Sequence, residues 1–215
     1  DLMYQFCQQH GVAHEACGKV VVALDENELP ALDELLKRGT ANGLTNLRRM
    51  TIEELREYEP NINGFAGVFV RETGIADYKQ VTQAYAKVIQ QEGGEIRTGA
   101  KVTSVSRRGG EIILETNSHP VRCRTLVNCG GLQSDRVARM CGLVPQVKIV
   151  PFRGEYYKLS PRASKLVRNL VYPVPNPQFP FLGVHFTRMI HGGIEAGPNA
   201  VLALSRNGYS WRKIS

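Results

Sequence analysis

Thr125-Leu-Val-Asn-Cys-Gly-Gly-Leu-Gln-Ser-Asp135 joins an apolar run to two adjacent glycines and then to polar residues that can start a helix. Glycines at such a junction remove the side chains that would hold a large ligand away from the main chain. The helix start that follows offers free N–H groups and the positive end of the helix dipole. The stretch therefore predicts a junction at which a cofactor approaches the backbone, although a plain tight turn would also use two glycines.

Further motifs lie on both sides of this junction. The longer ones are Pro151-Phe-Arg-Gly-Glu-Tyr-Tyr157, Tyr172-Pro-Val-Pro175, Phe181-Leu-Gly-Val-His-Phe-Thr-Arg188 and Gly197-Pro-Asn-Ala200. The shorter ones are Asp1-Leu-Met-Tyr-Gln-Phe-Cys7, Gly74-Ile-Ala-Asp-Tyr78 and Gly142-Leu-Val-Pro145. Together they resemble the L-2-hydroxyglutarate dehydrogenase or oxidase family, flavoproteins of the D-amino-acid-oxidase-like superfamily. The resemblance extends nearly from end to end.

One element of that family is missing from the sequence. Its members begin with a strand, a Gly-x-Gly-x-x-Gly turn and a helix that hold the pyrophosphate of the cofactor. That spacing occurs nowhere in these 215 residues. We therefore expect an internal fragment of a longer enzyme, inactive on its own.

The composition fits a folded chain, since 42% of the 215 residues are hydrophobic. No segment reaches the ~18 consecutive apolar residues of a membrane span, and the start does not resemble a signal or transit peptide. Lys and Arg exceed Asp and Glu by 27 to 20, a formal charge of +7. The basic residues are scattered without interleaved aromatic residues, so we expect no nucleic-acid partner. The charge suits a dianionic substrate and peripheral contact with acidic lipid.

The five cysteines are odd in number and form no Cys-x-x-Cys pair, which argues against a disulfide framework. A reducing compartment fits best, either the cytoplasm or, in a eukaryote, the mitochondrion. Cys7, His10, His14 and Cys17 could together suggest a zinc site. Gly11 interrupts any helix that would align the histidines, so we expect no metal and instead a buried cysteine on each side of a helix-to-strand loop.

Hydrophobic periodicity and capping signals predict alternating helices and strands. Helices are expected over residues 1–10 and 25–37, from Thr51 to before Pro60, and from Asp77 to Gly93. Strands are expected over residues 19–24, 66–70, 101–106, 111–116, 121–127, 147–150, 155–159, 170–172 and 183–186. The three runs between 101 and 127 suggest a β-meander that returns to the main sheet. Prolines 173, 175, 177 and 180 predict an irregular loop instead of a central strand.

The resemblance implies a mixed α/β fold like that of D-amino-acid oxidases, built from two interleaved units. A partial FAD-binding unit would comprise residues 1–18 and 76–145. A β-rich substrate-binding unit would comprise residues 19–75 and 146–215.

The resemblance also implies that the cofactor is FAD. Three segments are expected to approach it: an extended segment beside the adenine, the glycine junction, and a loop near the flavin ring. The predicted cofactor-binding residues are Val102, Cys129, Gly130, Gly131, Gly197, Pro198 and Asn199. The family more often has Cys-Ala-Gly at the junction, so Gly130 is a small departure. Without the family, both glycine segments are equally typical of ordinary turns.

Oxidation of a 2-hydroxy acid requires a base for the hydroxyl proton, because the redox power resides in the cofactor. Histidine suits this role, since its unperturbed pKa lies near ~6.5. His185 lies in the most distinctive motif of the chain and is the predicted catalytic base. A strand histidine between valine and phenylalanine is otherwise typical of a core residue.

The substrate carboxylates require cations, and arginine can bind a carboxylate through two parallel N–H bonds. Arg153 and Arg188 are the predicted clamps, although Arg153 could equally form a structural ion pair with Glu155 or another acid. Tyrosine and threonine hydroxyls nearby could bind substrate, and tyrosines in proline-rich loops often only pack. The predicted substrate-binding residues are Arg153, Tyr156, Tyr172, Thr187 and Arg188.

His191 stands where the family commonly has an aspartate before glycine. His191-Gly192-Gly193 predicts a hairpin turn, and the change puts no catalytic residue in doubt.

The function that the resemblance implies is FAD-dependent oxidation of L-2-hydroxyglutarate to 2-oxoglutarate. A related flavoenzyme that acts on an amino acid or on glycerol phosphate would share the cofactor unit and differ in the substrate strands. A non-catalytic binding module is a third hypothesis, because the pyrophosphate loop is absent and the charge is basic.

Overall fold

The computed structural model describes residues 2–176, 178–179 and 181–209. The chain forms two compact units. The first unit comprises Asp1–Lys87 and Gly154–Ala200, and the second comprises Val88–Arg153 and Val201–Ser215. This mixed α/β architecture agrees with the predicted fold class. The predicted division into a cofactor unit and a substrate unit concerns function and stays a prediction.

The helices and short 3-10 turns are α1 (Leu2–Gln9), η1 (Glu26–Glu28), α2 (Leu29–Ala41), α3 (Ile52–Arg56), α4 (Tyr78–Gln91), η2 (Gly131–Gln133), α5 (Ser134–Met140) and α6 (Pro161–Ser164). The strands are β1 (His14–Glu15), β2 (Lys19–Ala23), β3 (Met50–Thr51), β4 (Ala66–Val70), β5 (Ile75–Ala76), β6 (Val102–Arg108), β7 (Glu111–Thr116), β8 (Val121–Cys123), β9 (Phe152–Lys158), β10 (Leu170–Pro173), β11 (His185–Arg188) and β12 (Ile194–Leu202). None of the helices in the described ranges has the length and apolar character that crossing a bilayer requires.

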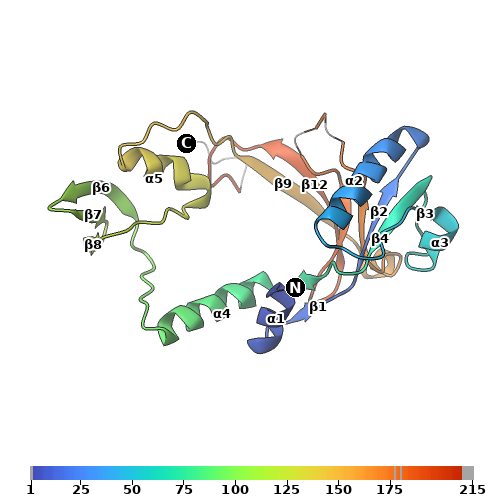
Figure 1. Ribbon diagram of the computed structural model, residues 1–215, viewed down its shortest axis with the longest axis horizontal. Coiled ribbons are helices and arrows are strands. Elements are labelled where there is room, and N and C mark those ends of the chain that lie inside the picture. The colour runs from blue at the N-terminus through green and yellow to red at the C-terminus, as the bar shows by residue number, and fades with distance from the viewer. Residues whose placement is uncertain (1, 177, 180, 210–215) are drawn as a thin grey trace. The chain divides into compact units, whose positions relative to one another are not determined.

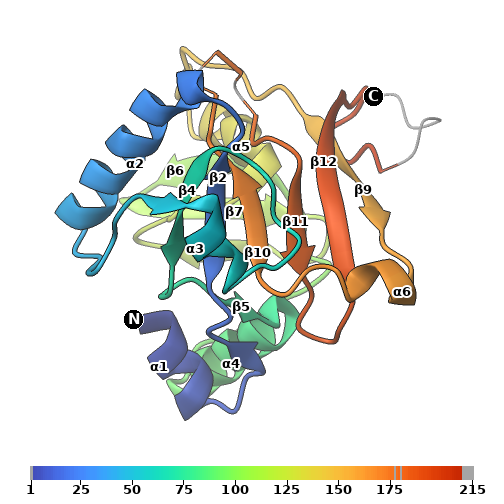
Figure 2. The same cartoon turned by 90° about the vertical axis from the view of Figure 1, so that its right-hand side faces the viewer.

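The first unit is built on a sheet with strand order β3-β4-β2-β10-β11-β12-β9 (Figure 2). Strand β2 is parallel to β10 and antiparallel to β4, and β11 is antiparallel to both β10 and β12. Strands β9 and β12 continue from this unit into residues of the second unit. The prediction of a β-rich C-terminal region is therefore confirmed.

Side chains alternate along each strand, so successive residues point to opposite faces of this sheet. A different helix covers each face. Val21 and Ala23 pack with Leu32 of α2, whereas Val20 and Val22 pack with Leu55 of α3. Figure 1 shows α2 and α3 on opposite sides of β2 and β4. Leu32 and Leu55 are fully buried, so these two helices close the core at the β2–β4 end of the sheet.

Local signals located most helix starts correctly. Thr51 and Glu54 form the predicted reciprocal capping box at the start of α3. Asp77 accepts hydrogen bonds from the N–H groups of Lys79 and Gln80 at the start of α4. At the second predicted helix the chain first makes the turn η1, capped by Asp25, and α2 then runs beyond Lys37 to Ala41.

Helix α1 packs on α4 through a small core of Cys7, Val12, Val81 and Ala84. Cys7 is buried and Cys17 is partly exposed, on the two sides of the loop between α1 and β2. Among the described residues there is no cluster of three or more side chains of the kinds that bind metals.

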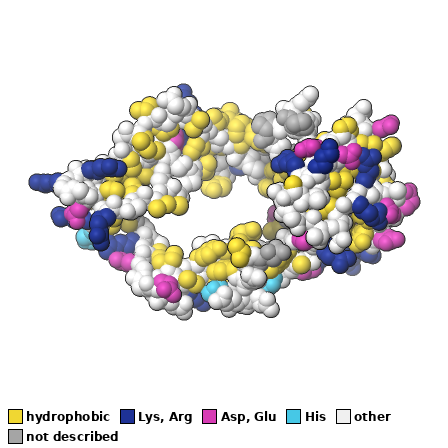
Figure 3. All heavy atoms as spheres, viewed as in Figure 1, with side chains coloured by type: hydrophobic (Ala, Val, Ile, Leu, Met, Phe, Trp, Pro, Cys, Tyr) yellow, Lys and Arg dark blue, Asp and Glu magenta, His cyan; other side chains and the backbone are white. Residues whose placement is uncertain are grey.

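In the second unit, β6, β7 and β8 form an antiparallel meander, as predicted. Its arginines at 107, 108, 122 and 124 are exposed, and Figure 3 shows dark-blue basic side chains over it. The prediction that this meander returns to the main sheet is wrong. Strand β8 ends at Cys123, and Val127 is 77% exposed, because no strand in the described part of the chain pairs with residues 124–130.

The structure corrects further predicted boundaries in the C-terminal half. Residues 147–150 form no strand, and β9 starts earlier than predicted. Helix α6 and strand β12 were not predicted, because their residues lack a clear hydrophobic periodicity. Pro173 is the last residue of the central strand β10 instead of part of a loop. Pro175 lies in the irregular segment as expected, and Pro177 and Pro180 lie outside the described residues.

Candidate active site

His185 lies on one face of the first-unit sheet together with Tyr172 and Thr187. Val171 pairs with Phe186 across β10 and β11, so Tyr172 stands opposite His185 and their side chains share a face. We call this the His185 face; it also carries Val21 and Ala23 of β2. The imidazole of His185 stacks on the ring of Tyr172, with centroids 4.0 Å apart and an angle of 17° between the planes.

A backbone carbonyl fixes the tautomer of the His185 ring. Nδ1 of His185 lies 2.8 Å from the carbonyl oxygen of Gly183, which can only accept a hydrogen bond. Nδ1 therefore carries the proton and the lone pair of the neutral ring resides on Nε2. His185 is only 6% exposed, so its ring is held in place by the surrounding sheet.

The environment of Tyr172, beside His185, changes its pKa. Burial raises the pKa of Tyr172, and a hydrogen bond from the Thr187 side chain partly opposes this shift. Tyr172 is therefore a neutral phenol near pH 7. The structure thus brings three of the predicted site residues together: His185, Tyr172 and Thr187.

Tyr156 on β9 contacts two glycines of the first unit. A Cβ atom added at Gly197 would lie 2.6 Å from Cδ1 of Tyr156, and one added at Gly154 would lie 3.1 Å from its Cε2. Both glycines are thus needed for this ring to lie against the sheet. Gly197, Pro198 and Asn199 belong to strand β12, so the predicted loop at Gly197-Pro-Asn-Ala200 is wrong.

Arg188 does not join the His185 face. Strand alternation turns its side chain to the opposite face, where Nη2 forms an ion pair with Glu15 at 3.0 Å and Nη1 donates to the carbonyl of Arg168 at 3.3 Å. The predicted second clamp is therefore occupied by a carboxylate of the chain itself.

Arg153 belongs to the second unit, where its guanidinium donates to the carbonyl of Gly208 at 3.3 Å. It makes further interactions as well. Its assignment as a substrate clamp stays a prediction.

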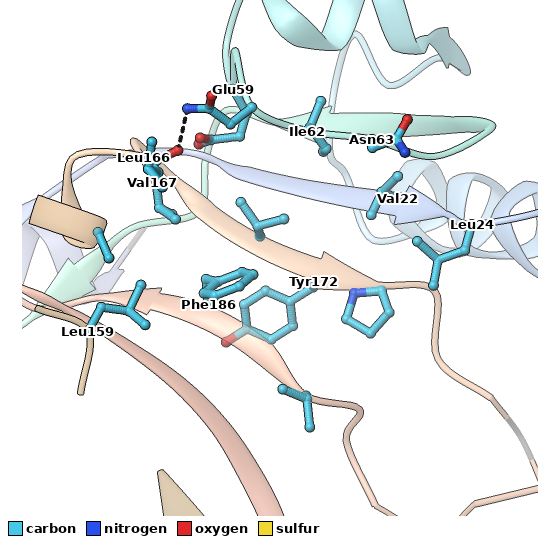
Figure 4. Close-up of a pocket in the computed structure, with 15 residues that line it drawn as sticks. Val22, Leu24, Glu59, Ile62, Asn63, Leu159, Leu166, Val167, Tyr172 and Phe186 are labelled. Carbon is cyan, nitrogen blue, oxygen red and sulfur yellow. Dashed lines mark hydrogen bonds between the residues drawn. The ribbon is translucent and has the colours of Figure 1, made fainter. Parts of the chain in front are cut away.

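An apolar cavity of about 540 Å³ is lined by residues of β2, β10 and β11, among them Tyr172 (Figure 4). Val22, Val171 and Phe186 line it. Its one carboxylate, that of Glu59, already accepts hydrogen bonds from the N–H groups of Arg168 and Asn169 at 2.9 Å. This cavity has no cation among its lining residues and does not suit a dianionic substrate.

In the second unit, the structure brings two predicted cofactor-binding residues to one pocket. Val102 and Gly130 both line a cavity of about 610 Å³, together with Lys101, Gln133, Arg136, Val137, Met140 and Asn207. Cys129 and Gly130 are exposed, and Gly131 has a φ of +52° that favours glycine. A Cβ atom at Gly130 would lie 3.0 Å from Oδ1 of Asn128, which is closer than ordinary contact. The residues present fit a cofactor that approaches the backbone here.

Asn128 and Asp135 hold this junction in shape. Oδ1 of Asn128 accepts from the N–H of Gly130 at 3.1 Å, and its Nδ2 donates to the carbonyl of Ser134 at 2.8 Å. The carboxylate of Asp135 accepts hydrogen bonds from both Arg206 and Arg139, and these hydrogen bonds lower its pKa well below the usual range. The Asp135–Arg206 pair leaves no local pattern in the sequence, because its members are 71 positions apart.

At the end of the β11–β12 hairpin, Gly192 and Gly193 both have positive φ, which confirms the predicted turn. The neighbouring His191 lies 2.9 Å from the carboxylate of Asp77, the residue that caps α4.

The chain is similar to known FAD-dependent proteins. The model of the family described as "FAD dependent oxidoreductase" matches residues 1–213. The chain is 47% identical over 214 residues to the L-2-hydroxyglutarate dehydrogenase of Indibacter alkaliphilus, covering 99% of this chain and 54% of that protein. It is 44% identical to the L-2-hydroxyglutarate dehydrogenase of Escherichia coli K12, covering 98% of this chain and 50% of that protein. The mitochondrial human enzyme of that name is 39% identical, at 97% and 48% coverage.

Solved structures share the fold at lower identity. The L-α-glycerophosphate oxidase of Mycoplasma pneumoniae with FAD bound superimposes with a TM-score of 0.82 and 23% identity, over 94% of this chain and 54% of that chain. The L-proline dehydrogenase of P. horikoshii gives a TM-score of 0.81 and 19% identity, over 93% and 53% of the two chains. The chain thus spans about half the length of the curated relatives it matches. On this evidence it belongs to the FAD-dependent oxidoreductase family.

Proposed function

We propose that the chain is part of an enzyme that oxidises L-2-hydroxyglutarate to 2-oxoglutarate with FAD. The observation that carries this proposal is the 47% identity, over 99% of the chain, to a protein named L-2-hydroxyglutarate dehydrogenase. Proteins with the same name in Escherichia coli and human share 44% and 39% identity with it. The likeness to enzymes for proline and glycerophosphate lies below 25% identity and supports the fold alone.

In this proposal the second unit contributes to the cofactor site. Val102, Cys129, Gly130 and Gly131 would hold FAD beside the cavity that Val102 and Gly130 line, and Lys101 and Arg136 add positive charge there. Gly197, Pro198 and Asn199 of β12, in the first unit, remain proposed cofactor-binding residues. Bound FAD supplies the two-electron oxidation of the C2 carbon.

His185 is the proposed base for the C2 hydroxyl. Its Nδ1–H is engaged by Gly183, so Nε2 is the atom that accepts the proton. Tyr172 holds the imidazole by stacking, and Thr187 fixes the Tyr172 hydroxyl. Arg153 is the proposed clamp for the substrate carboxylate next to C2.

The enzyme is proposed to work in a reducing compartment. The human relative is named as a mitochondrial protein. The +7 charge and the exposed arginines of the β6–β8 meander support peripheral contact with acidic lipid.

A substrate panel tests the proposed function. The full-length FAD-loaded protein is mixed anaerobically with L-2-hydroxyglutarate, L-proline or glycerol 3-phosphate, and flavin bleaching is followed. We expect fast bleaching with L-2-hydroxyglutarate alone and one 2-oxoglutarate formed for each flavin reduced. Preferential reduction by L-proline or glycerol 3-phosphate would assign the chain to a different flavoenzyme.

A further inference from the structure

The His185 face carries a cationic side chain, that of Lys19 at the start of β2. Lys19 pairs with Leu170 in register, and Val21 pairs with Tyr172, so Lys19 lies one row away from Tyr172 on the same face. Its ammonium nitrogen lies 5.4 Å from the centroid of the Tyr172 ring. His185 lies on the neighbouring strand on the other side of Tyr172, and its ring centroid is 4.0 Å from that of Tyr172.

Lys19 is half-buried without a counter-ion. Within the described residues no carboxylate lies within ion-pair distance of its ammonium group, and burial lowers its pKa. A buried charge is costly unless it is paired. Contact with the face of the Tyr172 ring offsets only part of that cost.

Two acids of the first unit, Glu195 and Glu15, do not pair with Lys19. Glu195 shares the His185 face, but β10 and β11 lie between its strand and β2, a separation of roughly 14 Å at ~4.8 Å per strand. Glu15 is bound to Arg188 on the opposite face. Among the described residues, therefore, no acid of the His185 face lies within ion-pair distance of the Lys19 ammonium group.

We propose that Lys19 binds the distal carboxylate of a dicarboxylic 2-hydroxy acid while His185 accepts the proton of the C2 hydroxyl. The inference rests on the proposed function and makes Lys19 the residue that selects diacids over monoacids. Tyr172 lies between the two groups, since its ring contacts both the Lys19 ammonium group and the His185 imidazole. Lys19 thereby takes the place that Arg188 was expected to fill.

The test uses the full-length FAD-loaded protein with Lys19→Met, which keeps the length of the apolar stem. Two substrates are compared: L-2-hydroxyglutarate and L-2-hydroxybutyrate, which lacks the distal carboxylate. We expect kcat/KM for the diacid to fall about 10- to 100-fold, mainly through KM, as for the loss of one charge-assisted hydrogen bond. Turnover of the monoacid should change less than about twofold.

Two further variants make this comparison specific. Lys19→Arg should restore most of the preference for the diacid, because it restores the charge. Lys37→Met removes an exposed lysine on α2 and should leave both substrates unaffected. If Lys19→Met does not fold, Lys19→Gln takes its place in the same assays.

Binding of glutarate separates this inference from the proposed function. Isothermal titration calorimetry with glutarate and butyrate reports diacid binding whether or not L-2-hydroxyglutarate is oxidised. Equal glutarate affinity in the wild type and Lys19→Met overturns the role of Lys19, even if the enzyme oxidises L-2-hydroxyglutarate. A wild type that binds glutarate through Lys19 but does not oxidise L-2-hydroxyglutarate leaves the diacid site standing and removes the proposed function.

Discussion

The imidazole of His185 lies flat against the phenol ring of Tyr172, and Gly183 holds its Nδ1 through a hydrogen bond of 2.8 Å. Two independent contacts thus fix the orientation and the tautomer of one histidine. A histidine that only fills the core does not require one tautomer or one ring orientation. A general base does, because its unprotonated nitrogen must point toward the substrate.

Tyr172 should act by holding His185. Tyr172→Phe keeps the stacking and loses only the hydrogen bond with Thr187, so we expect kcat within about threefold of wild type. Tyr172→Leu removes the ring, and we expect kcat to fall about 10-fold or more because the imidazole is no longer held. Steady-state kinetics of both variants check this. A KM that rises strongly in Tyr172→Phe would instead show that the hydroxyl binds substrate.

Arg188 should act as a structural partner of Glu15. Both side chains are partly exposed, so Arg188→Met and Glu15→Gln should each change the free energy of unfolding by about 1 kcal/mol or less. The KM for L-2-hydroxyglutarate should stay within about twofold of wild type in both. An increase in KM that is confined to Arg188→Met would restore the role of substrate clamp that the sequence suggested.

Glu59 should stabilise the start of β10, the strand that carries Tyr172. Its carboxylate is 2% exposed and accepts hydrogen bonds from the backbone of Arg168 and Asn169. Glu59→Ala leaves those N–H groups unpaired, and we expect a loss of about 3 kcal/mol in the free energy of unfolding. The exposed neighbour Glu57→Ala is the matched control and should change it by less than about 0.5 kcal/mol. Urea denaturation of both variants measures this difference. Equal losses in the free energy of unfolding would show that the buried carboxylate of Glu59 does not stabilise the fold.

Asp135 should make stability depend on pH in the acid range. Its pKa in the folded state is lowered by Arg206 and Arg139, so its contribution is fully present above the unfolded pKa of ~3.9. The contribution is lost as pH falls from about 4 toward the lower folded pKa. Thermal unfolding between pH 7 and pH 2 should therefore show a smaller acid-induced drop in Tm for Asp135→Asn, and a lower Tm at pH 7.

Arg97→Met serves as the control for this measurement, since it breaks an exposed ion pair with Glu95 in the same unit. Its Tm should follow that of the wild type at every pH. Identical acid profiles for Asp135→Asn and wild type would contradict the assigned role of Asp135.

The sequence predicted those elements whose signals are local. The capping box of Thr51 and Glu54 and the cap of Asp77 lie within four residues of the helices they start, so pattern alone located them. The hairpin at Gly192-Gly193 required positive φ, which glycine supplies. These features depend little on the rest of the chain.

The predictions that failed depend on distant partners. Leu126 and Val127 have the pattern of a buried strand, but a strand forms only where another strand pairs with it. Strand β12 contains Gly197 and Pro198, residues that normally predict a turn, and is held by its neighbours β11 and β9. The same holds for the proposed site: the motif indicates His185 as a candidate, whereas a single lysine at position 19 carries no pattern before the sheet register is known.

The pH profile of His185→Gln in the full-length FAD-loaded enzyme tests the account most directly. Glutamine keeps a polar side chain in the sheet but cannot accept the hydroxyl proton near neutral pH. We predict that kcat for L-2-hydroxyglutarate falls about 100-fold or more and that the acidic limb of the kcat/KM profile disappears. Unchanged turnover with an unchanged pH profile would contradict the claim that His185 is the base.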